Sequence, residues 1–385
     1  MSKLIFHSAQ RAAQDWRCPR SRYYTYDFEE GIKKDNLSVD LYLGSVVHDA
    51  IAGIAASHQR GDSKVDIQKI VNLSKESFET VLSEHMGESD NELIQIKELT
   101  TLVGGLLYGF YNLVWPNILT EYPNIKAIEQ EMIFPHDLTG KANPNGPFIY
   151  MAKPDLVMED TDGNLCYFEW KTTGTKKSEW IESWKTAKQI HCTMKAIEFT
   201  FGQAPQCAIV QGLYKGSQNY GKFSSPLVYG YKTAKANPPF TLMNYSYEYR
   251  AGFKKFPTWE LDSLEDWVNK MPQEMVSEQF PQTPRIFLDE NLADSFFRQR
   301  AIREADVQEV NHELQTEEEQ EARTYLLDKY FPQSFDQCRP AWGQECEFKR
   351  LCHNLQAGED PLNHGYLQKD RSHESPYIEL AGRLP

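Results

Sequence analysis

The stretch "CYFEWKTTG", residues 166–174, places charged side chains in what otherwise reads as a buried strand. Its apolar and aromatic residues predict a strand inside the core. Glu169 and Lys171 are two positions apart, so they project from the same face of that strand. Burying charge is costly unless the charge is paired or bound to a metal. The stretch is therefore either a structural ion pair or one part of an active site.

The preceding run "FIYMAKPDLVM" predicts the strand that pairs with this one. Between the two runs, "EDTDGN" contains an Asp-Gly pair, which is a hairpin signal. Pairing about this turn would bring Asp155 close to Glu169 and Lys171. Two carboxylates at one place suit Mg²⁺ or Mn²⁺, and a neighbouring lysine can orient or deprotonate an attacking water. The hairpin thus predicts a site for metal-assisted phosphodiester hydrolysis, with a strand-edge salt bridge as the alternative.

The rest of the chain predicts an α/β core with helical additions at both ends. The stretch "LGSVVHDAIAGIAASH" (43–58) has helical apolar spacing, and Ser45 is its expected N-cap. Further helices are expected at 64–87, 92–115 and 179–200. A charged helical segment is expected at 294–330, and its acidic run "QTEEEQEAR" is expected to be a solvated helix face. Strands are expected in "IKAIEQEMIF", "FIYMAKPDLVM" and "LCYFEWKTT", near 206–214 and at 226–233. The remainder is expected to be helical.

Composition and charge narrow the class of protein. With 385 residues, 40% hydrophobic and 25% charged, the chain is typical of a soluble globular protein. A formal net charge of −14 argues against a protein coated in nucleic acid, but it allows a local basic groove or metal ions that neutralise phosphates. The uncharged stretch 102–119 contains glycine, asparagine and proline, so we expect a buried helix rather than a membrane span. The N-terminus lacks a signal-peptide apolar core, which predicts a cytosolic protein.

The seven cysteines fall into two groups. Cys166, Cys192 and Cys207 lie in apolar surroundings, where we expect reduced thiols in the core. The other four are Cys18 near the start of the chain and the clustered Cys338, Cys346 and Cys352. Clustering in a cytosolic chain favours a metal over disulfides. Four thiolates suffice for a [4Fe–4S] cluster, whereas a zinc site more often shows two close pairs; zinc or unligated cysteines remain the alternatives.

Pro154-Asp155, thirteen intervening residues and then Glu169-Trp170-Lys171 resemble the PD-(D/E)XK nuclease motif. The surrounding motifs resemble the RecB-like exonuclease branch of that superfamily, especially its phage-type and CRISPR-associated iron–sulfur members. "LGSVVHDAI" is similar to that branch's helical histidine motif, and "WKTAKQI" is similar to its glutamine motif. "CPRSRYY" (18–24) and "CRPAWGQECEFKRLC" (338–352) are similar to the two halves of its split cysteine site.

The resemblance implies a fold class and a domain plan. The fold would be α/β, with a restriction-endonuclease-like core of a helix, a three-stranded antiparallel part, a helix and a further strand. Helical N- and C-terminal additions would be joined by the metal cluster. A single nuclease domain would span 1–353, with its core at about 120–235, a helical part at 1–119 and a cysteine-cluster part at 255–353. Residues 354–385 would form a C-terminal tail.

The resemblance also implies roles for individual residues. The implied catalytic residues are Asp155, Glu169, Lys171 and Gln189. The implied metal site, for one or two Mg²⁺ or Mn²⁺ ions, consists of His48, Asp155, Glu169 and Trp170. The implied cluster ligands are Cys18, Cys338, Cys346 and Cys352. Two positions depart from the family pattern: Ala152 replaces a glycine, and Thr193 replaces an aromatic residue. Either Glu129 or Glu131 could add a further carboxylate.

The expected function is a metal-dependent DNA nuclease, acting as an exonuclease in phage-type recombination or replication, or in CRISPR-like DNA processing. The expected partner is DNA, single-stranded or at its ends, with no membrane and with oligomerisation left open. The alternative is a catalytically silent DNA-binding or assembly protein on a nuclease fold, although the intact Asp–Glu–Lys set argues against it. DNA contacts are expected at two places, which could also be solvated surface: around Trp16, Arg17, Arg20, Arg22, Tyr23 and Tyr24, and at Lys176 and Lys177.

Overall fold

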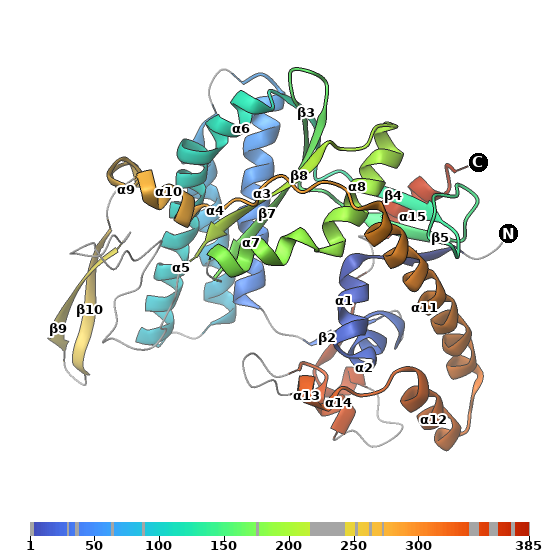
Figure 1. The fold of residues 1–385 in the computed structure, drawn as a ribbon. Helices are drawn as coiled ribbons and strands as arrows, with labels where there is room; N and C mark the ends of the chain where they lie inside the picture. The colour runs from blue at the N-terminus through green and yellow to red at the C-terminus, as the bar shows by residue number, and fades with distance from the viewer. Residues whose placement is uncertain are drawn as a thin grey trace.

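The computed structural model describes residues 4–28, 31–34, 38–62, 65–86, 89–174, 177–215, 243–250, 253–261, 264–271, 273–338, 346–353, 361–370 and 374–384. Within these ranges the chain is mixed α/β, with several small sheets and many helices (Figure 1). The largest described sheet has the strand order β3-β6-β7-β8. Its strands are β3 (Asn124–Ile128), β6 (Leu156–Glu159), β7 (Leu165–Thr173) and β8 (Cys207–Tyr214).

The hairpin between β6 and β7 forms as the sequence predicts. Gly163 adopts a left-handed φ of 86°, and Asp160 Oδ1 accepts hydrogen bonds from the backbone N–H groups of Asp162 and Asn164, both at 2.9 Å. Strand β6 pairs antiparallel with β7, and Leu156 lies opposite Phe168. Strand β8 then adds parallel to β7. The register places the residue before β6, Asp155, beside the centre of β7.

The two faces of this sheet carry different helices, because side chains alternate along each strand. One face packs Phe168, Trp170 and their neighbours against a helical layer. That layer consists of α3 (Val39–Gln59), α4 (Ile67–His85), α5 (Asp90–Gly109), the π-helical turn η3 (Phe110–Val114) and α6 (Trp115–Glu121). The opposite face packs Tyr167 and Val210 against α8 (Lys188–Phe201) and α11 (Glu290–Thr316).

Helix α3 differs from its predicted start. The helix begins at Val39 with Ser38 at the N-cap position, so the predicted N-cap at Ser45 is wrong; the Ser45 hydroxyl donates within the helix to the carbonyl of Leu41 at 3.3 Å. Among the described residues, α3 is the one helix long and apolar enough to cross a membrane. Its buried side chains instead join the core beneath the sheet, which favours a soluble protein. The apolar stretch 102–119 is also buried in helices of this layer, as predicted.

Two of the predicted strands are each divided between two sheets. "IKAIEQEMIF" forms β3 and then β4 (Met132–His136), while "FIYMAKPDLVM" forms β5 (Phe148–Ala152) and then β6. The first break falls at Glu129, whose φ of 48° is left-handed. The second falls at Pro154, which lacks an N–H and restricts the residue before it. Strands β4 and β5 join β1 (Ile5–His7) in a separate sheet of order β1-β5-β4.

Other boundaries also differ from the prediction. The helix expected at 179–200 is two helices, α7 (Lys177–Lys185) and α8. The sequence predicts helices in this region, but β9 (Met243–Arg250) and β10 (Phe253–Leu261) are strands that form an antiparallel pair. The charged segment 294–330 is divided between α11 and α12 (Gln320–Tyr330). The strand predicted at 226–233 lies outside the described residues.

The two ends of the chain pack together (Figure 1). Near the start lie α1 (Ala9–Arg17), α2 (Pro19–Arg22), the π-helical turn η1 (Tyr23–Asp27) and β2 (Ile32–Lys34). Later come α9 (Leu264–Lys270), α10 (Gln273–Gln279), α13 (Phe335–Cys338), α14 (Lys349–His353), η4 (Pro361–His364), β11 (Tyr366–Gln368) and α15 (Ser375–Ala381). Strand β11 pairs with β2, and α15 packs on β4, so the described part of 354–385 lies against the body of the protein.

Candidate metal and catalytic site

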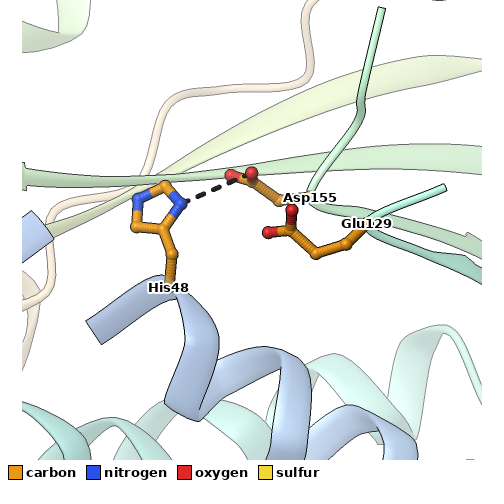
Figure 2. Close-up of side chains that lie close together, drawn as sticks. All are labelled: His48, Glu129 and Asp155. Carbon is orange, nitrogen blue, oxygen red and sulfur yellow. Dashed lines mark ion pairs between the residues drawn. The ribbon is translucent and has the colours of Figure 1, made fainter. Parts of the chain in front are cut away.

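Asp155 and His48 meet at the end of the β6–β7 hairpin. The backbone N–H of Trp170 donates to Asp155 Oδ2 at 2.6 Å, which fixes the carboxylate against β7. His48 projects from α3, and its Nδ1 lies 3.4 Å from the other oxygen, Asp155 Oδ1 (Figure 2). The predicted metal ligands His48 and Asp155 are therefore neighbours, although they come from a helix and a strand far apart in the sequence.

Glu129 is the third member of this group. Its carboxylate points toward Asp155 and His48 (Figure 2), and one ligand atom from each of the three lies within 4.8 Å of the others. The left-handed bend at Glu129 is uncommon for a residue other than glycine, and such conformations cluster at functional sites. The Glu129 N–H donates to the Asp155 carbonyl at 3.1 Å, which holds the bend in place. Of the two glutamates that the sequence offered, the structure brings Glu129 to the site.

Glu169 forms a second, adjacent group with Lys171 and Gln189. The Nζ atom of Lys171 lies 2.5 Å from Glu169 Oε1, and Gln189 Nε2 donates to the same oxygen at 2.9 Å. The Tyr167 hydroxyl donates to the other oxygen, Oε2. Glu169 is buried at 2% exposure. Three polar side chains, those of Lys171, Gln189 and Tyr167, therefore converge on the Glu169 carboxylate at the face of β7 that packs against α8.

Tyr167 is a site residue that the sequence reasoning missed. It lies two positions before Glu169, so strand alternation puts it on the same face. The alternation of side chains along the strand was the sequence signal that could have identified Tyr167. Trp170, between Glu169 and Lys171, points its indole to the opposite face, where the ring packs against Phe110 with centroids 5.4 Å apart. At the site itself, Trp170 contributes its backbone N–H to Asp155.

Charge and burial set the protonation of these groups. Burial raises the pKa of Glu169, the nearby Asp155 charge raises it further, and Lys171 opposes both effects. For Lys171, burial acts to lower the pKa, but the charges of Glu169 and Asp155 outweigh it and leave the pKa raised. For His48, burial likewise acts to lower the pKa, and the hydrogen bond and charge of Asp155 leave it raised. The site therefore concentrates negative charge that attracts cations.

No protein-family model matches the sequence, and no curated protein matches it. The functional assignment therefore rests on the motifs in the sequence and on the geometry of this site.

Four of the cysteines lie in the region where the chain ends meet. Cys18 separates α1 from α2, Cys338 ends α13, and Cys352 lies in α14. The Cys346 N–H donates to the Cys338 carbonyl at 3.1 Å. Burial raises the pKa of the Cys346 thiol, and the charges of Cys18 and Cys338 add to the shift; burial likewise raises the pKa of Cys352 to about 12. Among the described residues, no three cysteines place their sulfur atoms within 4.8 Å of one another.

The other three cysteines are reduced and fully buried, as the sequence predicts. Cys166 and Cys207 lie opposite each other on the parallel strands β7 and β8, with their sulfur atoms 3.5 Å apart. Cys192 lies in α8 within the core cluster on the other face of the sheet. These thiols fill apolar space.

Two of the expected DNA contacts are corrected by the structure. Arg20 and Arg22 are buried, and both are bound to acidic residues late in the chain: Arg20 to Asp328 at 2.7 Å and Arg22 to Glu304 at 2.6 Å. Their cations stabilise the packing of the chain ends and do not face solvent. Trp16 remains half exposed. Of the second pair, Lys176 lies outside the described residues and Lys177 begins α7.

Proposed function

We propose that this protein is a metal-dependent deoxyribonuclease of the PD-(D/E)XK type. One observation carries the proposal: His48, Glu129 and Asp155 converge within 4.8 Å beside the pair formed by the buried Glu169 and the partly exposed Lys171. A purely structural ion pair between Glu169 and Lys171 has no need of this second acidic group. Together the two groups form the constellation that phosphodiester hydrolysis requires.

The donor set fits a divalent cation of the Mg²⁺ or Mn²⁺ type. The two carboxylates are hard oxygen ligands that suit both ions, and the imidazole is a nitrogen ligand more typical of transition metals, so it fits Mn²⁺ better than Mg²⁺. When bound, the ion would polarise the scissile phosphate and lower the pKa of a water molecule. His48, Glu129 and Asp155 would hold it, and Glu169 would add a carboxylate to the ligand set. Lys153, 2.7 Å from Glu129 Oε2, orients that glutamate.

The remaining residues of the site act on water and on substrate. Lys171 keeps its proton in the buried site, so its ammonium can donate to the attacking water or to a phosphate oxygen as negative charge develops there. Gln189 holds the Glu169 carboxylate and also lines the adjoining cavity, from which it could contact the substrate. The Tyr167 hydroxyl donates a hydrogen bond to the second oxygen of Glu169 and so fixes its position. These contacts keep Glu169 and Lys171 in one orientation.

The substrate we propose is DNA, with exonucleolytic cleavage, and the supporting argument is the resemblance of the motifs to RecB-like exonucleases. The same resemblance supports a cytosolic role in phage-type recombination or replication, or in CRISPR-like DNA processing.

We further propose that Cys18, Cys338, Cys346 and Cys352 bind a [4Fe–4S] cluster. Four thiols are the ligand set that such a cluster takes, and these four lie close enough for their charges to act on one another. Cys18 lies near the start of the chain, and the other three lie near its end. The cluster would therefore join the two ends, and its role would be structural.

The proposed function is tested by incubating the purified protein with end-labelled single- and double-stranded DNA in Mg²⁺ or Mn²⁺. We expect cleavage that EDTA abolishes and that added metal restores. Tight DNA binding without cleavage in either metal would favour the catalytically silent DNA-binding protein instead.

A further inference from the structure

A cavity of about 260 Å³ lies between the two ends of the chain and the catalytic group. Its walls come from the start of α1, from η1, β5 and α8, and from C-terminal residues. The charged residues in its lining are Arg11, Lys153, Lys369 and Glu374. This excess of cations suits an anionic ligand. The volume is at the small end of ligand sites, so it would hold one nucleotide unit rather than a length of strand.

Arg11 is the most informative residue in this lining. Its side chain is 7% exposed, Nη1 donates to the Phe6 carbonyl at 2.6 Å, and Nη2 lies 3.8 Å from Glu374 Oε1. Its Nε is buried and has no hydrogen-bond partner within the part of the chain that the structure describes. A buried donor without a partner costs free energy. Nε itself is out of reach of solvent, but the Arg11 side chain lines the cavity, where a phosphate oxygen would accept a charge-assisted hydrogen bond from its guanidinium.

Tyrosine rings provide the apolar part of the cavity. Tyr26 contacts both cations: the Arg11 guanidinium carbon lies 4.8 Å and Lys369 Nζ lies 4.9 Å from its ring centroid. This arrangement holds the two cations at one wall. Tyr150 and Tyr377 add aromatic surface elsewhere in the lining. Aromatic rings next to cations are the surfaces on which nucleic-acid bases stack.

Two residues of the cavity lining also contact residues of the catalytic site. Gln189 lines the cavity and also donates to Glu169. Lys153 lines it as well, and its Nζ lies 2.7 Å from Glu129 Oε2. A phosphodiester bond adjoining a nucleotide in the cavity would therefore reach the catalytic residues.

We infer that this cavity binds the terminal nucleotide of a DNA strand, with a phosphate at Arg11 and the base against the tyrosines. The inference rests on the proposed nuclease function and adds a requirement for a strand end. Lys369, Glu374 and Tyr377, from the C-terminal segment, form one wall of the cavity, and the inference requires that this wall stops the strand at its last nucleotide. Hydrolysis of the adjoining bond consumes one water and yields one mononucleotide and a strand one residue shorter.

The first test compares a linear single-stranded oligonucleotide with the same oligonucleotide ligated into a circle. We expect the native protein to degrade the linear form at least a hundredfold faster. Arg11→Gln should lower kcat/KM on the linear form at least tenfold, and Lys369→Gln, at a partly exposed position, should act in the same direction. Arg60→Gln is the control, because Arg60 is an exposed cation at the end of α3 whose partners are Ser57 and Asp62.

The second test measures binding without cleavage. Lys171→Ala protein is dialysed against deoxyadenosine monophosphate, with adenosine and inorganic phosphate as separate probes. We expect one mononucleotide per chain and at least tenfold weaker binding when Arg11→Gln is added. Equal rates on linear and circular DNA, or mononucleotide binding that is indifferent to Arg11→Gln, would overturn the inference while leaving a nuclease in place. Cleavage of neither DNA would contradict the proposed function, and the dialysis would still decide whether the cavity takes a nucleotide.

Discussion

The His48 imidazole lies 3.4 Å from Oδ1 of Asp155, with the Glu129 carboxylate beside them. Burial acts to lower the pKa of His48, yet its contact with Asp155 leaves that pKa raised. A protonated His48 thus places a positive charge beside Asp155, where a divalent ion would bind. Metal binding must displace that proton, since only the neutral imidazole is a ligand.

The substitution His48→Ala should therefore weaken metal affinity more than it weakens the fold. We expect cleavage to fall at low Mg²⁺ and to recover in part at high Mn²⁺, because the two carboxylates remain. The measurement is cleavage rate against metal concentration for both proteins. His58→Ala, on the same helix but beside Trp115, is the control and should leave the curve unchanged. Identical curves for the native and His48→Ala proteins would refute ligation.

A buried ion network should dominate the stability of the packed chain ends. Glu304 accepts from Arg22 and Arg300, and Arg300 also lies 2.8 Å from Asp15. Because removing one partner leaves buried charges uncompensated, Glu304→Ala should lower the free energy of unfolding by about 3–5 kcal/mol. Urea denaturation measures this loss. Glu309→Ala, at an exposed position of the same helix, should change it by less than about 0.5 kcal/mol.

The pair of histidines His7 and His136 should make stability depend on pH. Their Nε2 atoms lie 2.7 Å apart in an aromatic cluster. Burial lowers the pKa of His136 to about 4, and burial also lowers the pKa of His7 well below its usual value. Between pH 4 and pH 6.5 the unfolded chain, whose histidines have pKa values near 6.5, binds more protons than the folded chain. Stability should therefore be complete above pH 6.5 and should decrease as the pH falls toward 4, by about 3 kcal/mol for His136 alone.

Urea denaturation at intervals from pH 7 to pH 5 measures this decrease. In the double variant His7→Leu/His136→Leu the dependence on pH should flatten, whereas His312→Gln at an exposed position should preserve it. A native protein equally stable at pH 7 and pH 5 would contradict the assignment of a neutral buried pair.

The cysteine proposal predicts iron, sulfide and a shared structural role. Anaerobically purified protein should be brown and should contain about four iron and four sulfide per chain. Cys18→Ser should lower both contents and make the C-terminal region sensitive to protease, because the cluster joins the two ends. Cys166→Ser, in the core of β7, should leave iron content unchanged. Zinc in place of iron would contradict the [4Fe–4S] cluster but not the four-cysteine metal site. A Cys18→Ser protein with its full metal content and a protease-resistant C-terminal region would contradict the metal site shared by the two ends of the chain.

The parts of the site that the sequence predicted are those set by local geometry. The period of two in β7 and the Asp-Gly turn sufficed to bring Asp155 to Glu169 and Lys171, because a hairpin register follows from its turn. The helical spacing around His48 likewise predicted α3, although not its first residues. The same two-residue alternation of side chains in β7 also indicates that Tyr167 lies beside Glu169.

The features that the sequence did not predict correctly depend on contacts between distant segments of the chain. The choice between Glu129 and Glu131 required the left-handed bend after β3, which no local pattern indicates. Arg20 and Arg22 were expected at the surface, but their partners lie near the other end of the chain. The cavity wall at Lys369 depends on the pairing of β11 with β2 in the same way.

The nuclease proposal is decided by the rate of cleavage of end-labelled DNA with Mg²⁺ or Mn²⁺, compared among the native protein, Glu169→Ala, Lys171→Ala and the control Glu159→Ala. Glu159 lies at the turn end of the same hairpin, where it pairs with Lys126 of β3, away from the site. We expect metal-dependent cleavage by the native and control proteins, and a loss of about 100- to 1000-fold or more in the other two with the fold retained. Full activity in Lys171→Ala, or a native protein that cleaves DNA with neither metal while Lys171→Ala strongly lowers the melting temperature, would contradict this proposal and leave a structural ion pair.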